Sequence, residues 1–132
     1  MNTEETPKKT RTRSAKYSKT KGNAYETKIA KELRELGFEG VLTARFESKS
    51  KDNNKIDIVD TEGKLPVYIQ LKCTQNTPSY FKIEEECDLK DKPFCLIWNK
   101  QEKKEVNICS VGEVVMIPKS YFYELLQRVY IE

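Results

Sequence analysis

The spacing of apolar residues predicts a helix followed by three strands in the first half of the chain. Between Asn23 and Leu36 apolar side chains recur at helical spacing, and Gly37 follows as a C-terminal stop. The next apolar segments are short and rich in β-branched residues, which is typical of strands: Val41–Phe46, Ile56–Asp60 and Pro66–Lys72. The short polar connection between the last two strands predicts an antiparallel hairpin.

The second half of the chain predicts further strands and a closing helix. The sparse apolar positions of Tyr80–Lys90 fit either a short helix or irregular structure, and we expect the helix. The other expected elements are a buried strand at Phe94–Asn99, a turn at Lys100–Lys103, strands at Val106–Val111 and Glu113–Ile117 or one strand broken at Gly112, and a helix at Tyr121–Val129. This order predicts an α/β fold with a mixed sheet covered by helices.

Length and composition indicate a single domain that does not enter a membrane. The chain has 132 residues, 34% of them charged, and no apolar run approaches the roughly 20 residues of a membrane-spanning helix. The N-terminal residues are polar, so we expect no secretion signal. The four cysteines form no CxxC pair, and we therefore expect reduced thiols in a cytoplasmic protein.

The positive charge is concentrated at the N-terminus. Residues 1–22 carry seven basic and two acidic residues, a net charge of +5, whereas residues 23–132 carry 17 basic and 19 acidic residues, a net charge of −2. The sequence therefore predicts a disordered basic tail over residues 1–22 and a folded domain over residues 23–132. Such tails often bind nucleic acid, here through Lys16, Lys19 and Lys21, although a tail that only aids solubility has the same composition.

The chain contains no histidine, which excludes several classes of enzyme. Ser-His-Asp and Cys-His nucleophilic catalysis and histidine-liganded zinc chemistry all need that residue. The remaining reactive groups are carboxylates and lysines. Any catalysis would then depend on these groups and on a hard metal ion such as Mg²⁺, which prefers oxygen ligands.

Polar residues occupy interior positions of the two predicted hairpin strands. Side chains alternate along a strand, so Gln70 and Lys72 share one face of the second strand. In the first strand Asp57 points away from Ile56 and Ile58. If Asp57 pairs with Gln70 across the hairpin, the acid and the lysine meet each other or a metal, because an unpaired buried charge is costly. A purely structural ion pair would satisfy the same pattern.

Several segments together resemble the PD-(D/E)XK nuclease superfamily. The matching residues are Lys21–Glu26, Leu33, Leu36–Phe38, Arg45, Ser48, Ile56–Asp60 and Val67–Lys72. Within the superfamily they are most similar to the archaeal and phage Holliday junction resolvases, and next to the modification-dependent type IV restriction nucleases. Two positions differ: Ile56 replaces a proline, and Gln70 replaces an acidic residue, as in the QxK variant of the restriction branch.

The resemblance implies a restriction-endonuclease-like αβββαβ core and roles for five residues. Asp57 would be the main ligand of Mg²⁺ or Mn²⁺, with the Gln70 amide oxygen and the Leu71 carbonyl as further ligands. Glu26 would bind metal through water or complete a second site. Lys72 would orient the attacking water and stabilise charge on the phosphate.

The resemblance also implies DNA as the partner. Arg45 and Ser48 match positions near the phosphate backbone, and the loop before Asp57 adds three candidate phosphate contacts: Lys49, Lys51 and Lys55. We expect a homodimeric resolvase of branched DNA that serves recombination and repair in a prokaryotic, archaeal or phage-infected cell. A non-catalytic nucleic-acid-binding module and an unrelated α/β interaction protein are the alternatives.

Two neighbouring residues have simpler expected roles. Trp98 lies in an apolar run, so we expect a core position rather than a base-stacking one. Cys73 is expected to be a small buried residue on the face opposite Lys72.

Overall fold

The computed structural model describes residues 22–44 and 55–131. The predicted tail, including Lys16, Lys19 and Lys21, lies outside these ranges. Four of the five other candidate DNA contacts also lie outside them: Arg45, Ser48, Lys49 and Lys51.

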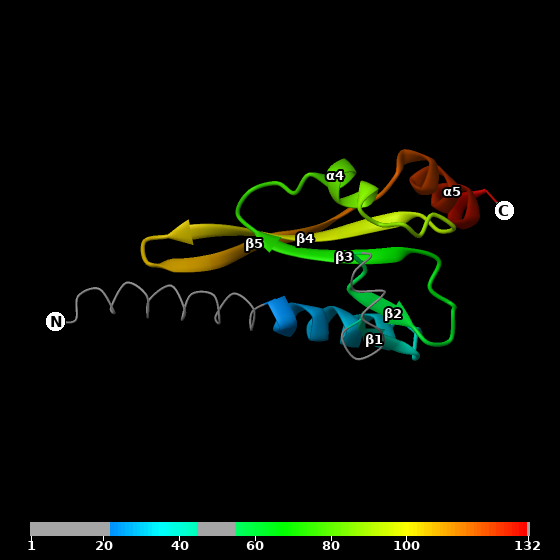
Figure 1. Cartoon of the computed structure of the whole chain (residues 1–132), viewed down its shortest axis with the longest axis horizontal. Helices are drawn as coiled ribbons and strands as arrows, with labels where there is room; N and C mark the ends of the chain where they lie inside the picture. The colour runs from blue at the N-terminus through cyan, green and yellow to red at the C-terminus, as the bar shows by residue number, and fades with distance from the viewer. Residues whose placement is uncertain (1–21, 45–54, 132) are drawn as a thin grey trace.

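The described residues form a mixed five-stranded sheet with three helices, which confirms the predicted α/β class (Figure 1). Residues 22–35 are helical, and the labelled elements follow in the order β1 (Val41–Thr43), β2 (Ile58–Asp60), β3 (Tyr68–Thr74), α4 (Tyr80–Glu85), β4 (Phe94–Lys104), β5 (Asn107–Met116) and α5 (Lys119–Tyr130). The strand order is β1-β2-β3-β4-β5, and only β3 and β4 are parallel. A parallel pair needs a crossover, and α4 lies in that connection. None of the described helices is long and apolar enough to cross a membrane.

The helix at residues 22–35 ends as the glycine predicts. Gly37 has a φ of +119°, a conformation that side chains disfavour. Its backbone N–H donates to the carbonyl of Arg34 at 3.0 Å, and that of Phe38 donates to the carbonyl of Leu33 at 3.1 Å. This pair of bonds forms a Schellman motif, which ends the helix and directs the chain into β1.

Two core clusters lie on opposite faces of the sheet. On one face the helix at residues 22–35 and α5 pack against alternate residues of β3; the buried members include Tyr25, Ile29, Ile69, Leu71 and Tyr121. On the other face α4 covers a second cluster, with Ile56, Val59, Cys87 and Phe94 buried and Tyr68 and Ile83 partly buried. The alternation of β3 places Gln70 and Lys72 on the α4 face. Cys73 packs against the first cluster, on the face opposite Lys72 as expected, but it is only partly buried.

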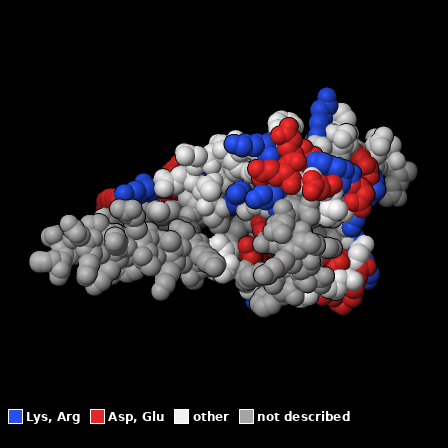
Figure 2. Space-filling model, in the orientation of Figure 1, with Lys and Arg blue, Asp and Glu red and all other residues white. Residues whose placement is uncertain are grey.

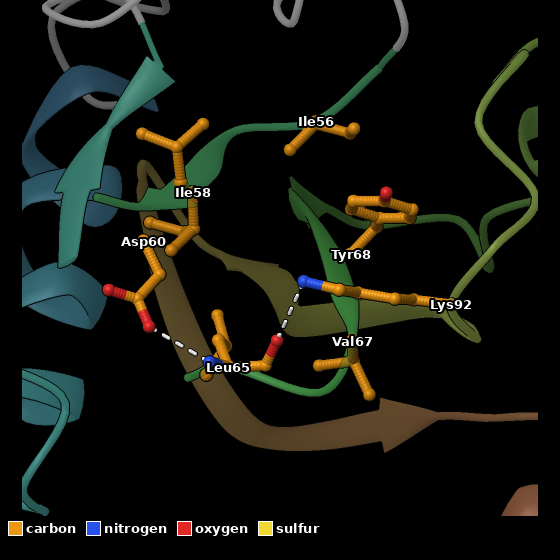
Figure 3. Close-up of a pocket in the computed structure, with 8 residues that line it drawn as sticks. Ile56, Ile58, Asp60, Leu65, Val67, Tyr68 and Lys92 are labelled. Atoms are coloured by element: carbon orange, nitrogen blue, oxygen red, sulfur yellow. Dashed lines mark hydrogen bonds between the residues drawn. The ribbon is translucent and has the colours of Figure 1, made fainter. Parts of the chain in front are cut away.

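The loop between β2 and β3 is held by one carboxylate (Figure 3). Asp60 accepts backbone N–H bonds from Glu62 at 3.0 Å, Lys64 at 2.7 Å and Leu65 at 2.8 Å. Burial alone would raise the pKa of Asp60, but these three donors lower it below its usual value. The ammonium of Lys92 donates to the Leu65 carbonyl at 3.2 Å and fixes the other side of the loop.

The predicted turn at Lys100–Lys103 is wrong, because these residues continue β4. The strand runs to Lys104, and the chain reverses at Glu105, which has a φ of +56°. The strand partner β5 is continuous and has a β-bulge at Val111, because Lys100 pairs with Gly112 whereas Gln101 pairs with Ser110. The β4–β5 hairpin extends past the end of β3 (Figure 1). The residues of β4 in this extension are polar, so the sequence there has no apolar alternation that would predict a strand.

Candidate functional site

Asp57 lies where β2 separates from β3. The two strands share one paired position, Ile58 with Ile69, and this is the register in which Asp57 stands opposite Gln70. The backbone N–H of Asp57 donates to the Ile69 carbonyl at 2.8 Å, and its carboxylate accepts the N–H of Leu71 at 2.8 Å. The side chain thus takes the place of a backbone acceptor in the ladder. This bond fixes the carboxylate at the point where the strands part.

The first hairpin strand begins later than predicted. It starts at Ile58, so Asp57 lies just before it. Ile56 packs in the cluster on the α4 face and Ile58 in the opposite cluster, so the prediction that both share one face is wrong. The two side chains differ because Ile56 and Asp57 precede β2 and do not follow the alternation of a strand.

The amide of Gln70 faces oxygen atoms of the neighbouring segment. Gln70 is only 7% exposed, and one end of its amide lies 3.2 Å from Asp57 Oδ2 and also contacts the Lys55 carbonyl oxygen. With the NH₂ group at this end, Gln70 donates to both oxygens. With the amide oxygen there, three oxygens converge, an arrangement that needs a cation. Sequence reasoning missed the Lys55 carbonyl, because only the turn at this residue brings it to the site.

These three oxygen atoms fit a hard divalent cation, which the site would bind weakly. A carboxylate, an amide oxygen and a backbone carbonyl are the ligand types that Mg²⁺ and Ca²⁺ prefer. Within residues 22–44 and 55–131, however, no group of three or more His, Cys, Asp or Glu side chains could hold a metal. The site therefore offers the correct atoms but little negative charge.

Lys72 lies two residues beyond Gln70 on the same face of β3. It is half-buried and makes no hydrogen bond or ion pair with the residues that the structure describes. The structural ion pair with Asp57 that the sequence allowed is therefore not formed. The Lys72 ammonium is therefore available to an anion on this face of β3.

Glu26 lies on the helix that covers the other face of the sheet. It is half-buried and follows Tyr25, whose ring lies in the core cluster of that face. The Tyr25 hydroxyl donates to Glu113 of β5 at 2.7 Å, and the Lys28 ammonium lies 3.2 Å from the same carboxylate. Burial and this bond raise the pKa of Tyr25, while the bond and Lys28 lower the pKa of Glu113. These contacts fix the rotation of the helix and with it the position of Glu26.

Lys55 is the one candidate DNA contact within the described ranges. Its side chain is exposed, and its ammonium lies 3.8 Å from a carboxylate oxygen of Glu86. Basic and acidic side chains are interspersed on the face that Figure 2 shows. The excess positive charge of the chain resides in its first 22 residues.

The family comparison covers the site. The family model described as archaeal Holliday junction resolvase (hjc) matches residues 17–91, more than half of the chain. This chain belongs to that family. The matched range contains Glu26, Asp57, Gln70 and Lys72. Searches of the curated proteins and of the solved structures each gave no significant match.

Membership confirms the resemblance seen in the sequence. The chain is a Holliday junction resolvase-like nuclease of the PD-(D/E)XK superfamily, and its partner is DNA. The mixed sheet and its helices are consistent with the restriction-endonuclease-like fold. The match ends before β4, so the β4–β5 hairpin and α5 lie outside it.

Proposed function

We propose that this resolvase-family chain is a metal-dependent endonuclease that hydrolyses phosphodiester bonds at four-way DNA junctions. The observation that carries the proposal is the meeting of the Asp57 carboxylate and the Gln70 amide where β2 leaves β3. Lys72 lies on the same strand face as Gln70, with its ammonium uncommitted among the described residues. Ligands for a metal ion and an ammonium for the phosphate then lie at successive positions on the same face of β3.

Three groups of this chain would hold the metal: Asp57 Oδ2, Gln70 Oε1 and the Lys55 carbonyl, with the Leu71 carbonyl that the resemblance implies as a further candidate. A bound Mg²⁺ supplies a Lewis acid for the phosphate oxygen and acidifies the attacking water. Lys72 orients this water and neutralises the charge that develops as the water oxygen bonds to phosphorus. The bond between phosphorus and the 3′ oxygen breaks, which leaves a 5′-phosphate and a 3′-hydroxyl. Glu26, on the helix that covers the opposite face of the sheet, is not part of this set, and the role through water or at a second metal position that the resemblance implies stays a prediction.

The glutamine lowers the charge of the proposed metal site by one unit relative to an acidic residue. Metal affinity at oxygen sites depends on the number of charged ligands. We therefore expect activity to need a Mg²⁺ concentration on the order of millimolar. Mn²⁺, which also takes carboxylate and carbonyl ligands, should substitute for it.

We also propose a homodimer. Symmetric resolution cuts two strands of a junction, which requires two active sites related by a two-fold axis. Support comes from apolar side chains that the described chain leaves exposed on β5 and α5, among them Val115 at 55%, Phe122 at 48% and Leu126 at 37%. The outer edge of β5 is also unpaired in the described sheet. Such a surface is typical of an interface between subunits.

The test is a cleavage assay on a labelled four-way junction and a linear duplex, with Mg²⁺ or Mn²⁺. Asp57→Asn and Lys72→Ala should each reduce junction cleavage by at least about 100-fold. Lys103→Ala, at an exposed lysine of the β4–β5 hairpin, is the matched control and should cleave normally. Full activity of both site variants would refute the proposal. Salt-sensitive binding without cleavage in any divalent metal would favour the non-catalytic module.

A further inference from the structure

Trp98 lies beside the proposed catalytic lysine. In the parallel β3–β4 pair, Trp98 is in register with Lys72, and the next residue across the sheet is Val114 of β5. Neighbouring strands are about 4.8 Å apart, so the side chains of Trp98 and Lys72 leave adjacent backbone positions on the α4 face. Trp98 is half-buried and belongs to neither core cluster of the described residues. The expected core position is therefore wrong.

Polar contacts fix the orientation of the indole. Its N–H donates to the hydroxyl of Thr74 at 3.0 Å and to the carbonyl of the same residue at 3.2 Å. The ammonium of Lys100 lies 5.8 Å from the ring centroid and donates to the Gln75 carbonyl at 2.6 Å. The edge of the ring that bears the N–H is thus tied to Thr74 of β3, with the Lys100 ammonium near the ring.

We infer that Trp98, with Lys100, forms a subsite for an unpaired nucleobase next to the scissile phosphate. This inference rests on the proposed function, because the phosphate is the one that Lys72 would contact. A fixed aromatic ring is a stacking surface for any base, and an adjacent ammonium adds attraction to the phosphate that follows the base. The subsite lies outside the residues that match the family model.

The subsite would contribute to the choice of branched DNA. In a continuous duplex each base is stacked on its neighbours, and extracting it costs a few kcal/mol. Bases at a branch point have lost part of this stacking. An aromatic surface beside the active site therefore favours junctions over linear DNA without reading sequence.

The chain has a single tryptophan, so fluorescence excited at wavelengths where its seven tyrosines do not absorb reports on this subsite alone. The full chain carrying Asp57→Asn, which is not expected to cleave, is titrated with a four-way junction or with a duplex of equal length. Labelled-DNA anisotropy measures binding independently. We expect the junction to quench the tryptophan at least about twofold more than the duplex at equal occupancy, because stacking on a base quenches the indole.

Substitutions measure the energetic contribution. Base stacking on an aromatic residue is worth about 1–3 kcal/mol, so Trp98→Leu should weaken junction binding about 5- to 150-fold and leave duplex binding within about twofold. Trp98→Phe keeps a ring and should lose less, which covers the case in which the leucine variant folds poorly. Leu36→Ala, at an apolar residue that is 75% exposed after the first helix and away from β5 and α5, is the control and should bind normally.

Each of the following outcomes would overturn the inference. Tight junction binding with unchanged tryptophan fluorescence, or equal losses for junction and duplex in Trp98→Leu, would remove the subsite and leave the proposed nuclease intact. Quenching that depends on protein concentration without DNA would show that a second copy covers the ring. Failure to bind any DNA would overturn both the subsite and the proposed function.

Discussion

Asp57 has a structural role that can be separated from its proposed role as a metal ligand. Its carboxylate accepts the Leu71 N–H at 2.8 Å where β2 and β3 part. Asp57→Ala removes this acceptor, whereas Asp57→Asn retains an oxygen that can accept the same bond. The two substitutions should therefore remove metal binding equally and differ in their effect on the free energy of unfolding.

The expected difference follows from the burial of the donor. Leu71 is 7% exposed, so its N–H has little access to water once the carboxylate is absent. A hydrogen bond to a charged group contributes about 1.5–3 kcal/mol, and an unsatisfied buried donor costs about 1–3 kcal/mol. We expect Asp57→Ala to lower the free energy of unfolding by about 2–3 kcal/mol and Asp57→Asn to lower it by about 1 kcal/mol or less.

The assay is urea unfolding followed by circular dichroism at pH 7 in the presence of a chelator. With an m-value of about 1.5 kcal/mol/M, the alanine variant should lose about 1.3–2 M in its midpoint and the asparagine variant less than about 0.7 M. Equal midpoints for the two variants would show that the Leu71 bond does not hold the strands, and the reasoning would fail.

Three further predictions concern the loop and the metal. Gly40→Ala would place a methyl group 2.7–2.8 Å from side chains of residues 60–62 and should cost about 1–3 kcal/mol in urea unfolding, whereas Gly112→Ala meets no atom within 4 Å and should be neutral; equal effects would contradict this. Because the folded pKa of Asp60 is lowered, its ionised form stabilises the protein above its unfolded pKa of about 3.9, and this contribution is lost as pH falls through the folded pKa. Thermal unfolding of Asp60→Asn should therefore depend less on pH below about 4 than that of the unsubstituted chain, and parallel profiles would be the contrary result. Gln70→Glu should lower the Mg²⁺ concentration for half-maximal cleavage about tenfold, and an unchanged metal titration would argue against Gln70 as a ligand.

The hairpin that carries the site could be predicted because its strands follow simple rules. Ile58 and Ile69 must both face the core, and this requirement, together with the short loop between the strands, sets the register that brings Asp57 opposite Gln70. Gly37 likewise marks the helix end, since a positive φ favours glycine. The order of helices and strands followed from the same periodicities.

Other features depend on tertiary context that periodicity does not contain. The continuation of β4 through Lys100–Lys103 comes from pairing with β5, since these residues have no apolar pattern of their own. The Lys55 carbonyl reaches Gln70 because Lys55 itself takes a left-handed conformation. Such a conformation is usually marked in the sequence by a glycine, and here it is not. Trp98 has apolar sequence neighbours, which predict a core position. Its side chain nevertheless lies outside the cluster that α4 covers, and periodicity does not show where that cover ends.

The hydrogen bond from Tyr25 to Glu113 joins a part of the chain that the family model matches to a part that it does not match. Tyr25 lies inside the matched range, whereas Glu113 belongs to β5 beyond it. A fragment cut to the matched residues would lose the acceptor for a phenol buried in the core, and the helix bearing Glu26 would no longer be braced. Domain boundaries for expression or for fusion proteins should therefore retain the C-terminal hairpin.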